Sequence, residues 1–543
     1  MKITCIIKAR ENTLQKLYIA SPHDCAARLY RRIPPFQKKT FFLAASSMLL
    51  VHFYMFVNKL LNHDELWSLL NSNEMTTSGR WALRYFTALS SAVSMPWVNG
   101  LICVFLFALT CNVLVSLFRV RRTLSAVLLC FSFAAFPSAA ATLTYCFQAD
   151  GSFFGIFLAT VAVWLMRRYK WGGIPALLCI GTSVGIYQAY FSFSAALCVL
   201  LLALDMLDGQ SDLRALLLRG LYYVAVLLAG MGFYFVGLRL RLDALHTTLT
   251  EYQGISQMGA VSAAQIVQAV GEAYRQFFRY YLENCRQFHY QISEPIAWAG
   301  GLAGLTAVAV LAVRTQTHRK PLQLLLLLVL IALIPLGCNL VYVMAPGSVV
   351  HSVMMYPLVL APIFLIVLAE RLCARVSRPF SRGIAWLLST ILLFSCTFFA
   401  YNDALLINQG YLRQQISTQQ AFAYTNRLAA RLENIEGYTL HTPVAPAGAP
   451  AYGTVRDPLE NYAGLRHLTG MVSGDTLIRA YSFGRLPMDY LGLPNPWMQG
   501  NELSVFLAQH ADAIEAMPIY PAAGSIALMD GVLVVHFGDD ESN

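Results

Sequence analysis

Long apolar runs alternate with short polar segments along most of this chain. Eleven of the runs approach or exceed the roughly 18 residues that a helix needs to cross ~30 Å of hydrocarbon. The pattern predicts a polytopic α-helical membrane protein with about 11 transmembrane helices, at residues 41–58, 98–118, 124–144, 150–166, 173–188, 190–206, 217–237, 296–313, 322–343, 352–369 and 383–401.

The composition supports the membrane assignment. Of 543 residues, 57% are hydrophobic and 13% are charged, whereas soluble domains carry about 25% charged residues. The twelve cysteines show no metal-type spacing, and most lie inside apolar runs, so they are interpreted as small buried side chains. The formal net charge of +10 comes with no nucleic-acid-binding motif, and no nucleic-acid partner is expected.

The basic residues predict the orientation. Clusters at 119–122, 167–170, 314–320 and 370–382 follow the second, fourth, eighth and tenth apolar runs. Lys and Arg concentrate in cytoplasmic loops. The chain is therefore expected in the cytoplasmic (inner) membrane with its N-terminus inside and its C-terminus outside.

This topology divides the chain into three parts. Residues 1–39 form a cytoplasmic N-terminal segment, and residues 40–401 form the transmembrane domain, with outer loops at 59–97 and 239–295. Residues 402–543 are expected to form a small C-terminal extracytoplasmic α/β domain.

Local patterns within the C-terminal part support that expectation. Helical apolar spacing continues to Gly437, and residues 438–445 follow with the composition of a strand. Asp530 and Gly531 separate two apolar runs near the end of the chain, which indicates a β-hairpin.

The long outer loop mixes arginines with aromatic residues. Arg275 and Arg279 lie beside Phe277, Phe278 and Tyr280, which predicts an amphipathic helix over about 262–287 lying along the membrane. Each arginine is also compatible with a surface role in which its stem covers apolar area.

The stretch NHDELWSLLNSNEMTTSGRW, residues 62–81, places acids directly after the first apolar run. One interpretation is structural: Asn62 caps a helix whose first turn holds Asp64 and Glu65. The other is chemical: an acid at the lipid–water boundary acts as general base on a lipid-borne substrate. The dipeptide does not decide between them.

Four motifs carry a family resemblance. They are DELW…GRW in the first loop, YCFQADGSFFG around Asp150, GIYQAYFS at 185–192, and MPIYPAAGSIALMDGVLVVHF at 517–537. Together they resemble the GT-C superfamily of membrane glycosyltransferases, and more closely the Gtr-type II (O-antigen) glucosyltransferase family, over about residues 45–538.

The resemblance implies a GT-C-like fold and a glycosyltransferase activity. A hexose, most simply glucose, would move from a polyprenyl-phosphate donor to a cell-surface glycan or glycolipid acceptor on the outer face of the membrane, with inversion. The implied base is an acid of the first outer loop, with Asp64 the first choice and Glu65 the second. A leaving phosphate requires nearby cations. The candidates are Arg80 and Arg84, which are four residues apart and therefore expected to share a helix face, with Arg275 and Arg279.

The remaining substrate-binding candidates have structural alternatives. Asp150 is either an N-cap or a sugar ligand, Tyr187 an interface anchor or a sugar ligand, and His351 a satisfied polar residue or a ligand. Gln188 has less structural reason for its place and is expected to bind a sugar hydroxyl. A divalent metal stays open, since Asp64, Glu65 and Asp150 offer oxygen ligands, but no pattern requires a cofactor.

Two other classes compete with this interpretation. A polysaccharide polymerase or ligase is also polytopic with outer arginines, but the C-terminal domain argues against it. A transporter of lipid-linked glycans requires polar residues or broken helices near the bilayer midplane. Most charges lie at the ends of the runs, although Pro137 and Pro335 interrupt two of them.

Overall fold

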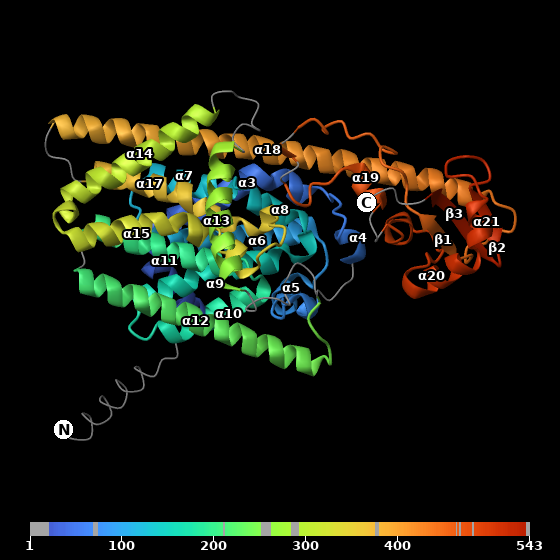
Figure 1. The fold of residues 1–543 in the computed structure, drawn as a ribbon, viewed down its shortest axis with the longest axis horizontal. Helices are drawn as coiled ribbons and strands as arrows, with labels where there is room; N and C mark the ends of the chain where they lie inside the picture. The colour runs from blue at the N-terminus through green and yellow to red at the C-terminus, as the bar shows by residue number, and fades with distance from the viewer. Residues whose placement is uncertain are drawn as a thin grey trace, which may run out of the picture.

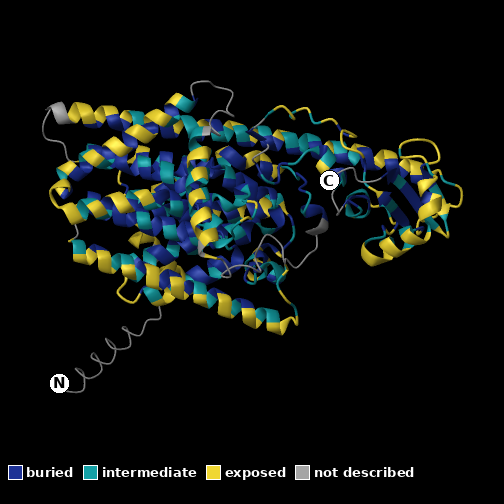
Figure 2. Cartoon of the chain, viewed as in Figure 1, coloured by how far each residue is buried: buried dark blue, intermediate teal, exposed yellow. Residues whose placement is uncertain are grey.

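The computed structural model describes residues 21–68, 74–209, 212–250, 262–283, 293–374, 379–462, 464–465, 468–479 and 483–538. Within this part of the chain, a bundle of long helices leads into a small sheet at one end (Figure 1). Apolar side chains fill the bundle interior, while many exposed side chains on its outer helices are also apolar, as expected where lipid surrounds them (Figure 2). The molecule is therefore a polytopic helical membrane protein.

The described helices that can cross a membrane account for up to ten of the eleven predicted spans. Nine described helices are long and apolar enough to span a bilayer, and a tenth span is the pair α7 and α8, bent by 44° at Pro137. Helix α10 corresponds to the remaining run but has only 14 residues. The bundle comprises α3 (Pro35–Val57), α6 (Pro96–Leu117), α7 (Thr123–Ala134), α8 (Pro137–Thr144), α9 (Cys146–Arg168), α10 (Gly173–Ile186), α11 (Tyr190–Leu207), α12 (Leu213–Ala244), α14 (Ser293–Arg314), α15 (Pro321–Cys338), α17 (Leu360–Cys373) and α18 (Pro379–Glu433).

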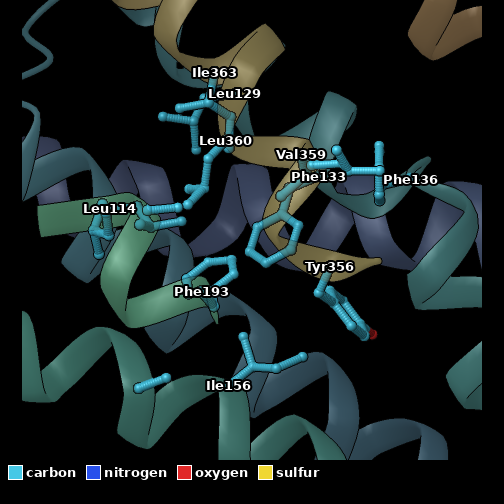
Figure 3. Close-up of a cluster of buried hydrophobic side chains, with 14 of the residues drawn as sticks. Leu114, Leu129, Phe133, Phe136, Ile156, Phe193, Tyr356, Val359, Leu360 and Ile363 are labelled. Carbon is cyan, nitrogen blue, oxygen red and sulfur yellow. The ribbon is translucent and has the colours of Figure 1, made fainter. Parts of the chain in front are cut away.

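Aromatic packing joins the centre of the bundle. Phe133 of α7 stacks with Phe193 of α11, with ring centroids 6.2 Å apart, and Tyr356 meets Phe133 edge-on (Figure 3). Leu114 from α6 and Ile156 from α9 fill the surrounding space. This core fixes the helix ends, from which the polar loops extend.

Shorter helices complete the loops. Helix α2 (Pro22–Arg32) precedes the bundle, α4 (Glu65–Ser68) and α5 (Leu83–Thr87) lie in the first loop, and α13 (Ala263–Phe278) and α16 (Val341–Met344) lie in later ones. Helix α13 runs across the direction of α15, against which it packs (Figure 1). A π-helical segment, η4 (Arg279–Glu283), follows it, while the rest of the predicted amphipathic segment, 284–287, lies outside the described residues.

The basic clusters meet at one end of the bundle. Arg119 and Arg371 both approach Asp208, at 3.8 and 3.0 Å. Arg167 makes a two-pronged ion pair with Asp205, at 2.8 and 3.0 Å. Loops that are far apart in sequence thus converge, and we call this the basic end.

The basic end extends to further helix termini through hydrogen bonds. Lys39, at the start of α3, donates to Thr123 at 3.1 Å, and Arg314, at the end of α14, donates to the Leu372 carbonyl at 2.8 Å. Predicted inside loops therefore share one end of the molecule, as the alternation of spans requires.

Helix α18 carries the chain away from the bundle. It is continuous over 55 residues, from Pro379 to Glu433, so the predicted boundary at residue 402 falls inside a helix. Beyond it lie β1 (Val444–Gly448), α19 (Gly474–Arg479), α20 (Gly500–Gln509), α21 (Ala511–Glu515), β2 (Ile526–Met529) and β3 (Val532–Gly538).

The three strands form a sheet in the order β1–β3–β2, with β1 parallel and β2 antiparallel to β3. Asp530 and Gly531 join β2 to β3 with positive φ angles of 47° and 78°, as the Asp-Gly signal predicts. The strand predicted over 438–445 begins later, at Val444, because Thr439 and Thr442 form a hydrogen-bonded turn.

Candidate functional site

The first loop begins with a capped turn. Asn62 is buried, its side-chain oxygen accepts the Asp64 N–H at 2.9 Å, and its carbonyl accepts the Glu65 N–H at 3.1 Å. Helix α4 then starts at Glu65. Asn62 therefore precedes a helix start, as the structural interpretation predicts, but only Glu65 lies in the first turn of that helix. The same turn fixes the backbone of both acids.

The two acids have different surroundings. The Asp64 side chain is 39% exposed, and its Oδ1 lies 3.4 Å from Nε2 of His63. The Glu65 side chain is fully buried and pairs with the Lys59 ammonium and the Ser94 hydroxyl. Burial raises the pKa of Glu65, and the Lys59 charge partly offsets that effect. Asp64 is accessible to a substrate, whereas Glu65 is already engaged.

His63, which contacts Asp64, also has two further ring side chains near it, Tyr145 and His351. The His63 and Tyr145 rings lie 6.4 Å apart, centroid to centroid. Burial lowers the pKa of His351, and the charge of the nearby His63 lowers it further. We call His63, Asp64, Tyr145 and His351 the Asp64 cluster. Sequence reasoning named Asp64 and His351 as site candidates but gave Tyr145 no role.

The C-terminal part reaches this cluster. Ser352, next to His351, exchanges hydrogen bonds of 2.9–3.0 Å with Thr469. Gly470, at φ +87°, lies so close to Thr144 and Asn62 that a Cβ there would be 1.9 Å from the Thr144 hydroxyl oxygen. Segment 468–471 therefore lies against the turn that holds Asp64, a contact that no local sequence signal indicates.

Asp150 is placed differently from expectation. Helix α9 already begins at Cys146, so Asp150 lies in its second turn and cannot be the N-cap. Its side chain is fully buried, and its Oδ1 accepts the adjacent Gly151 N–H at 2.9 Å. Asp150 is only five residues from Tyr145 of the Asp64 cluster, but its side chain is not exposed to a substrate.

A second cluster joins the GRW and IYQ motifs. Residues Met75 and Arg80 form an isolated antiparallel bridge around Gly79, which has a φ of +76°. Gln188 donates to the Ser78 carbonyl at 2.9 Å, and Tyr234 of α12 donates to the Gly79 carbonyl at 3.2 Å. Gln188 thus anchors the first loop, a role that sequence reasoning did not give it.

Tight packing of Trp81 fixes the same turn. The Trp81 indole lies against Gly185 and Gly237, and a Cβ at either glycine would come within 2.7 Å of the ring. The Ala82 N–H also donates to the Gly185 carbonyl at 2.9 Å. The glycine in GIYQ is therefore required by the tryptophan in GRW.

The first-loop arginines divide into two kinds. Arg84 and Arg241 both bind the carboxylate of Glu74, Arg241 at 2.7 Å. Burial raises the pKa of Glu74, but its bonds to Thr76, Arg241 and Arg84 outweigh that effect and leave the pKa lowered. Arg84 is therefore neutralised by an ionised partner that sequence reasoning did not single out.

Among the described residues, Arg80 has no such partner. Its guanidinium carbon lies 4.6 Å from the centroid of the Tyr187 ring, and its Nη1 contacts the Met75 sulfur at 3.7 Å. No carboxylate forms an ion pair with Arg80 among the described residues. The expectation that Arg80 and Arg84 share a helix face is wrong, because α5 starts only at Leu83.

The long-loop arginines lie elsewhere. Arg275 is 73% exposed and pairs with Glu272 on its own helix at 2.7 Å, and Arg279 begins the π-helical segment η4 after α13. The Tyr274 hydroxyl donates to the Ala332 carbonyl at 2.6 Å and attaches α13 to α15. None of these contacts involves the first loop.

Metal ligation finds no support in this geometry. Within the residues that the structure describes, no group of three or more His, Cys, Asp or Glu side chains is arranged to hold an ion. The arrangement that does exist is an accessible acid in the Asp64 cluster and a separate tyrosine-lined cation at Arg80, both on loops away from the basic end.

Comparisons with known proteins add the family. Searches of curated proteins and of solved structures gave no match. The family model described as Glucosyl transferase GtrII matches residues 53–362, more than half of the chain and the part that holds both clusters. This chain is a multi-pass membrane protein that belongs to the GtrII glucosyltransferase family.

Proposed function

We propose that this protein transfers glucose from a polyprenyl-phosphate donor to a hydroxyl of a cell-surface glycan or glycolipid, at the outer face of the cytoplasmic membrane. The proposal rests on the family and on one structural observation. Asp64 is the accessible acid of the first loop, whereas its rivals Glu65 and Asp150 are fully buried.

The orientation follows from charge. The basic end gathers the Lys- and Arg-rich loops, and such loops are retained in the cytoplasm. The Asp64 cluster lies on loops of the opposite set, with residues 468–471 beside it. Residues 1–39 would then be cytoplasmic, residues 40–401 would form the catalytic membrane domain, and residues 402–543 would lie outside.

Asp64 is the proposed general base. It would accept the proton of the acceptor hydroxyl while the hydroxyl oxygen forms a bond to the anomeric carbon. The bond from that carbon to the phosphate oxygen breaks on the opposite side, so the configuration inverts and the electron pair leaves with polyprenyl phosphate. A nearby His63 at 3.4 Å orients the Asp64 carboxylate.

Arg80 is the proposed phosphate contact. A cation stabilises the charge that develops on the leaving phosphate, and Arg80 is free of carboxylate partners among the described residues whereas Arg84 binds Glu74. Tyr187, under the guanidinium, holds it in place. Gln188 supports the turn, while Arg275, Arg279 and Asp150 receive no direct role in this proposal, and His351 borders the acceptor side.

Asp64→Asn tests the proposal. Asn keeps the size and hydrogen-bonding capacity of Asp but not its basicity, so glucosyl transfer should fall by roughly 10²–10⁴-fold while the protein still inserts. The assay measures transfer from a synthetic polyprenyl-phosphate glucose to isolated surface glycan, with variants at equal membrane levels. Full activity of the Asn variant would refute the assignment.

Glu65→Gln is the matched control. Its carboxylate is buried against Lys59 and Ser94, so this variant should lose thermal stability as well as activity, since one partner of a buried pair is left uncompensated. A protein as stable as the wild type but inactive is expected for Asp64→Asn alone.

A further inference from the structure

Helix α2 lies outside the family match, which begins at residue 53. Ser21 caps it by accepting the Asp24 N–H at 3.1 Å, and an extended link at Ile33 and Pro34 joins it directly to α3. The helix has Pro at its first position and arginines in its last turn, both of which favour helix formation.

The residues of α2 separate into two faces. Pro22, Ala26 and Tyr30 follow the i, i+4, i+8 spacing of one helix face, with Ile33 in the extended link behind them, and Arg28, Arg31 and Arg32 occupy the other face. The apolar side chains are not covered by protein: Tyr30 is 59% exposed and Ile33 is 42% exposed. The three arginines are exposed too, and none forms an ion pair within the described part of the chain.

The position of α2 identifies its surroundings. It precedes a membrane span, and Lys39 at the start of that span donates to Thr123 within the basic end. Lys38 stacks on the Tyr30 ring, 3.7 Å from its centroid, so α2 stays beside the first turn of α3. Residues 21–39 contain one acid, Asp24, and five Lys or Arg residues: Arg28, Arg31, Arg32, Lys38 and Lys39.

We propose that α2 is a surface anchor for the anionic headgroups of the membrane that holds α3. Its apolar side enters the headgroup boundary and its arginines bind lipid phosphates, the arrangement typical of interfacial amphipathic helices. A basic residue near an anionic surface strengthens attachment by about fivefold, so three give about two orders of magnitude at low salt.

Hydrogen exchange on the full-length protein in nanodiscs tests this anchor independently of glucosyl transfer. With phosphatidylglycerol, the amides of residues 24–32 should exchange at least tenfold more slowly than with phosphatidylcholine. The difference should shrink as salt is raised. The triple variant Arg28→Gln, Arg31→Gln, Arg32→Gln should abolish it, with exchange in the spanning helices unchanged.

The triple lysine variant at the same positions is the matched control. Lysine keeps the charge, so most of the lipid-dependent protection should remain. Equal exchange in the two lipids, whether fast or slow, would overturn the proposal, as would a lysine variant that behaves like the glutamine variant.

Discussion

Gly470→Ala tests how the C-terminal part meets the Asp64 cluster. Gly470 has a φ of +87°, a conformation that costs an L-residue about 1–2 kcal/mol. The new Cβ would also lie 1.9 Å from the Thr144 hydroxyl oxygen and 2.7 Å from the Asn62 amide nitrogen. Thr144 must rotate, which breaks its 2.7 Å bond to the Ala141 carbonyl and its 3.2 Å bond from Asn62.

The magnitude follows from these contacts. Two hydrogen bonds at about 1 kcal/mol each add about 2 kcal/mol to the backbone cost, so the total destabilisation is about 3–4 kcal/mol. Gly453→Ala is the matched control: its φ is +81°, but nothing lies within 4 Å of a Cβ there. That variant should lose only about 1–2 kcal/mol.

Denaturant unfolding in detergent and glucosyl transfer are the two measurements. Because Asn62 positions the Asp64 backbone, Gly470→Ala should also reduce transfer severalfold, whereas Gly453→Ala should leave it unchanged. If the two variants lose equal stability and equal activity, segment 468–471 does not support the cluster, and the argument from close packing fails.

Arg80→Ala should reduce glucosyl transfer at least tenfold without loss of stability. Arg84→Ala should mainly destabilise the protein, because it leaves the Glu74 carboxylate short of one partner. Equal effects of the two variants on activity and on unfolding would argue against Arg80 as the phosphate contact. The lowered pKa of His351 means that the folded state prefers the neutral imidazole. Its contribution to the free energy of unfolding is therefore present above the ordinary histidine pKa and is lost as pH falls through the lowered value. His351→Gln should weaken the pH dependence of the unfolding free energy measured at acid pH. A periplasmic-type reporter fused after Gly437 should be active and one fused near Arg168 inactive, and the reverse would remove the orientation argument.

The sequence was sufficient for features that depend on local pattern. Apolar length predicted the spans, Pro137 marked the bend between α7 and α8, and Asp530-Gly531 predicted the hairpin. Each depends on the chemistry of neighbouring residues. The continuous α18 was divided in the prediction, because its apolar span and its amphipathic extension have different compositions but the same backbone geometry.

The site was less predictable because its contacts are non-local. Asp64 and Glu65 are adjacent in sequence, yet Lys59 and Ser94 bury one acid and leave the other exposed. Glu74 lies within the acidic stretch at residues 62–81, but its pairing with Arg241 on α12 spans 167 positions. Such pairings arise from the packing of the bundle, so no local sequence motif predicts them.

The unbroken helix α18 joins the C-terminal sheet rigidly to a membrane span. At 1.5 Å per residue, 55 residues give a rod about 80 Å long, of which the part after residue 401 contributes about 50 Å. Transmembrane helices tilt to match bilayer thickness, and a tilt change of about 10° would move the far end of this lever by about 8 Å. With the proposed orientation, a change in membrane thickness would therefore shift the sheet sideways relative to the membrane span of α18, so the same chain would present its C-terminal part differently in thin and thick bilayers.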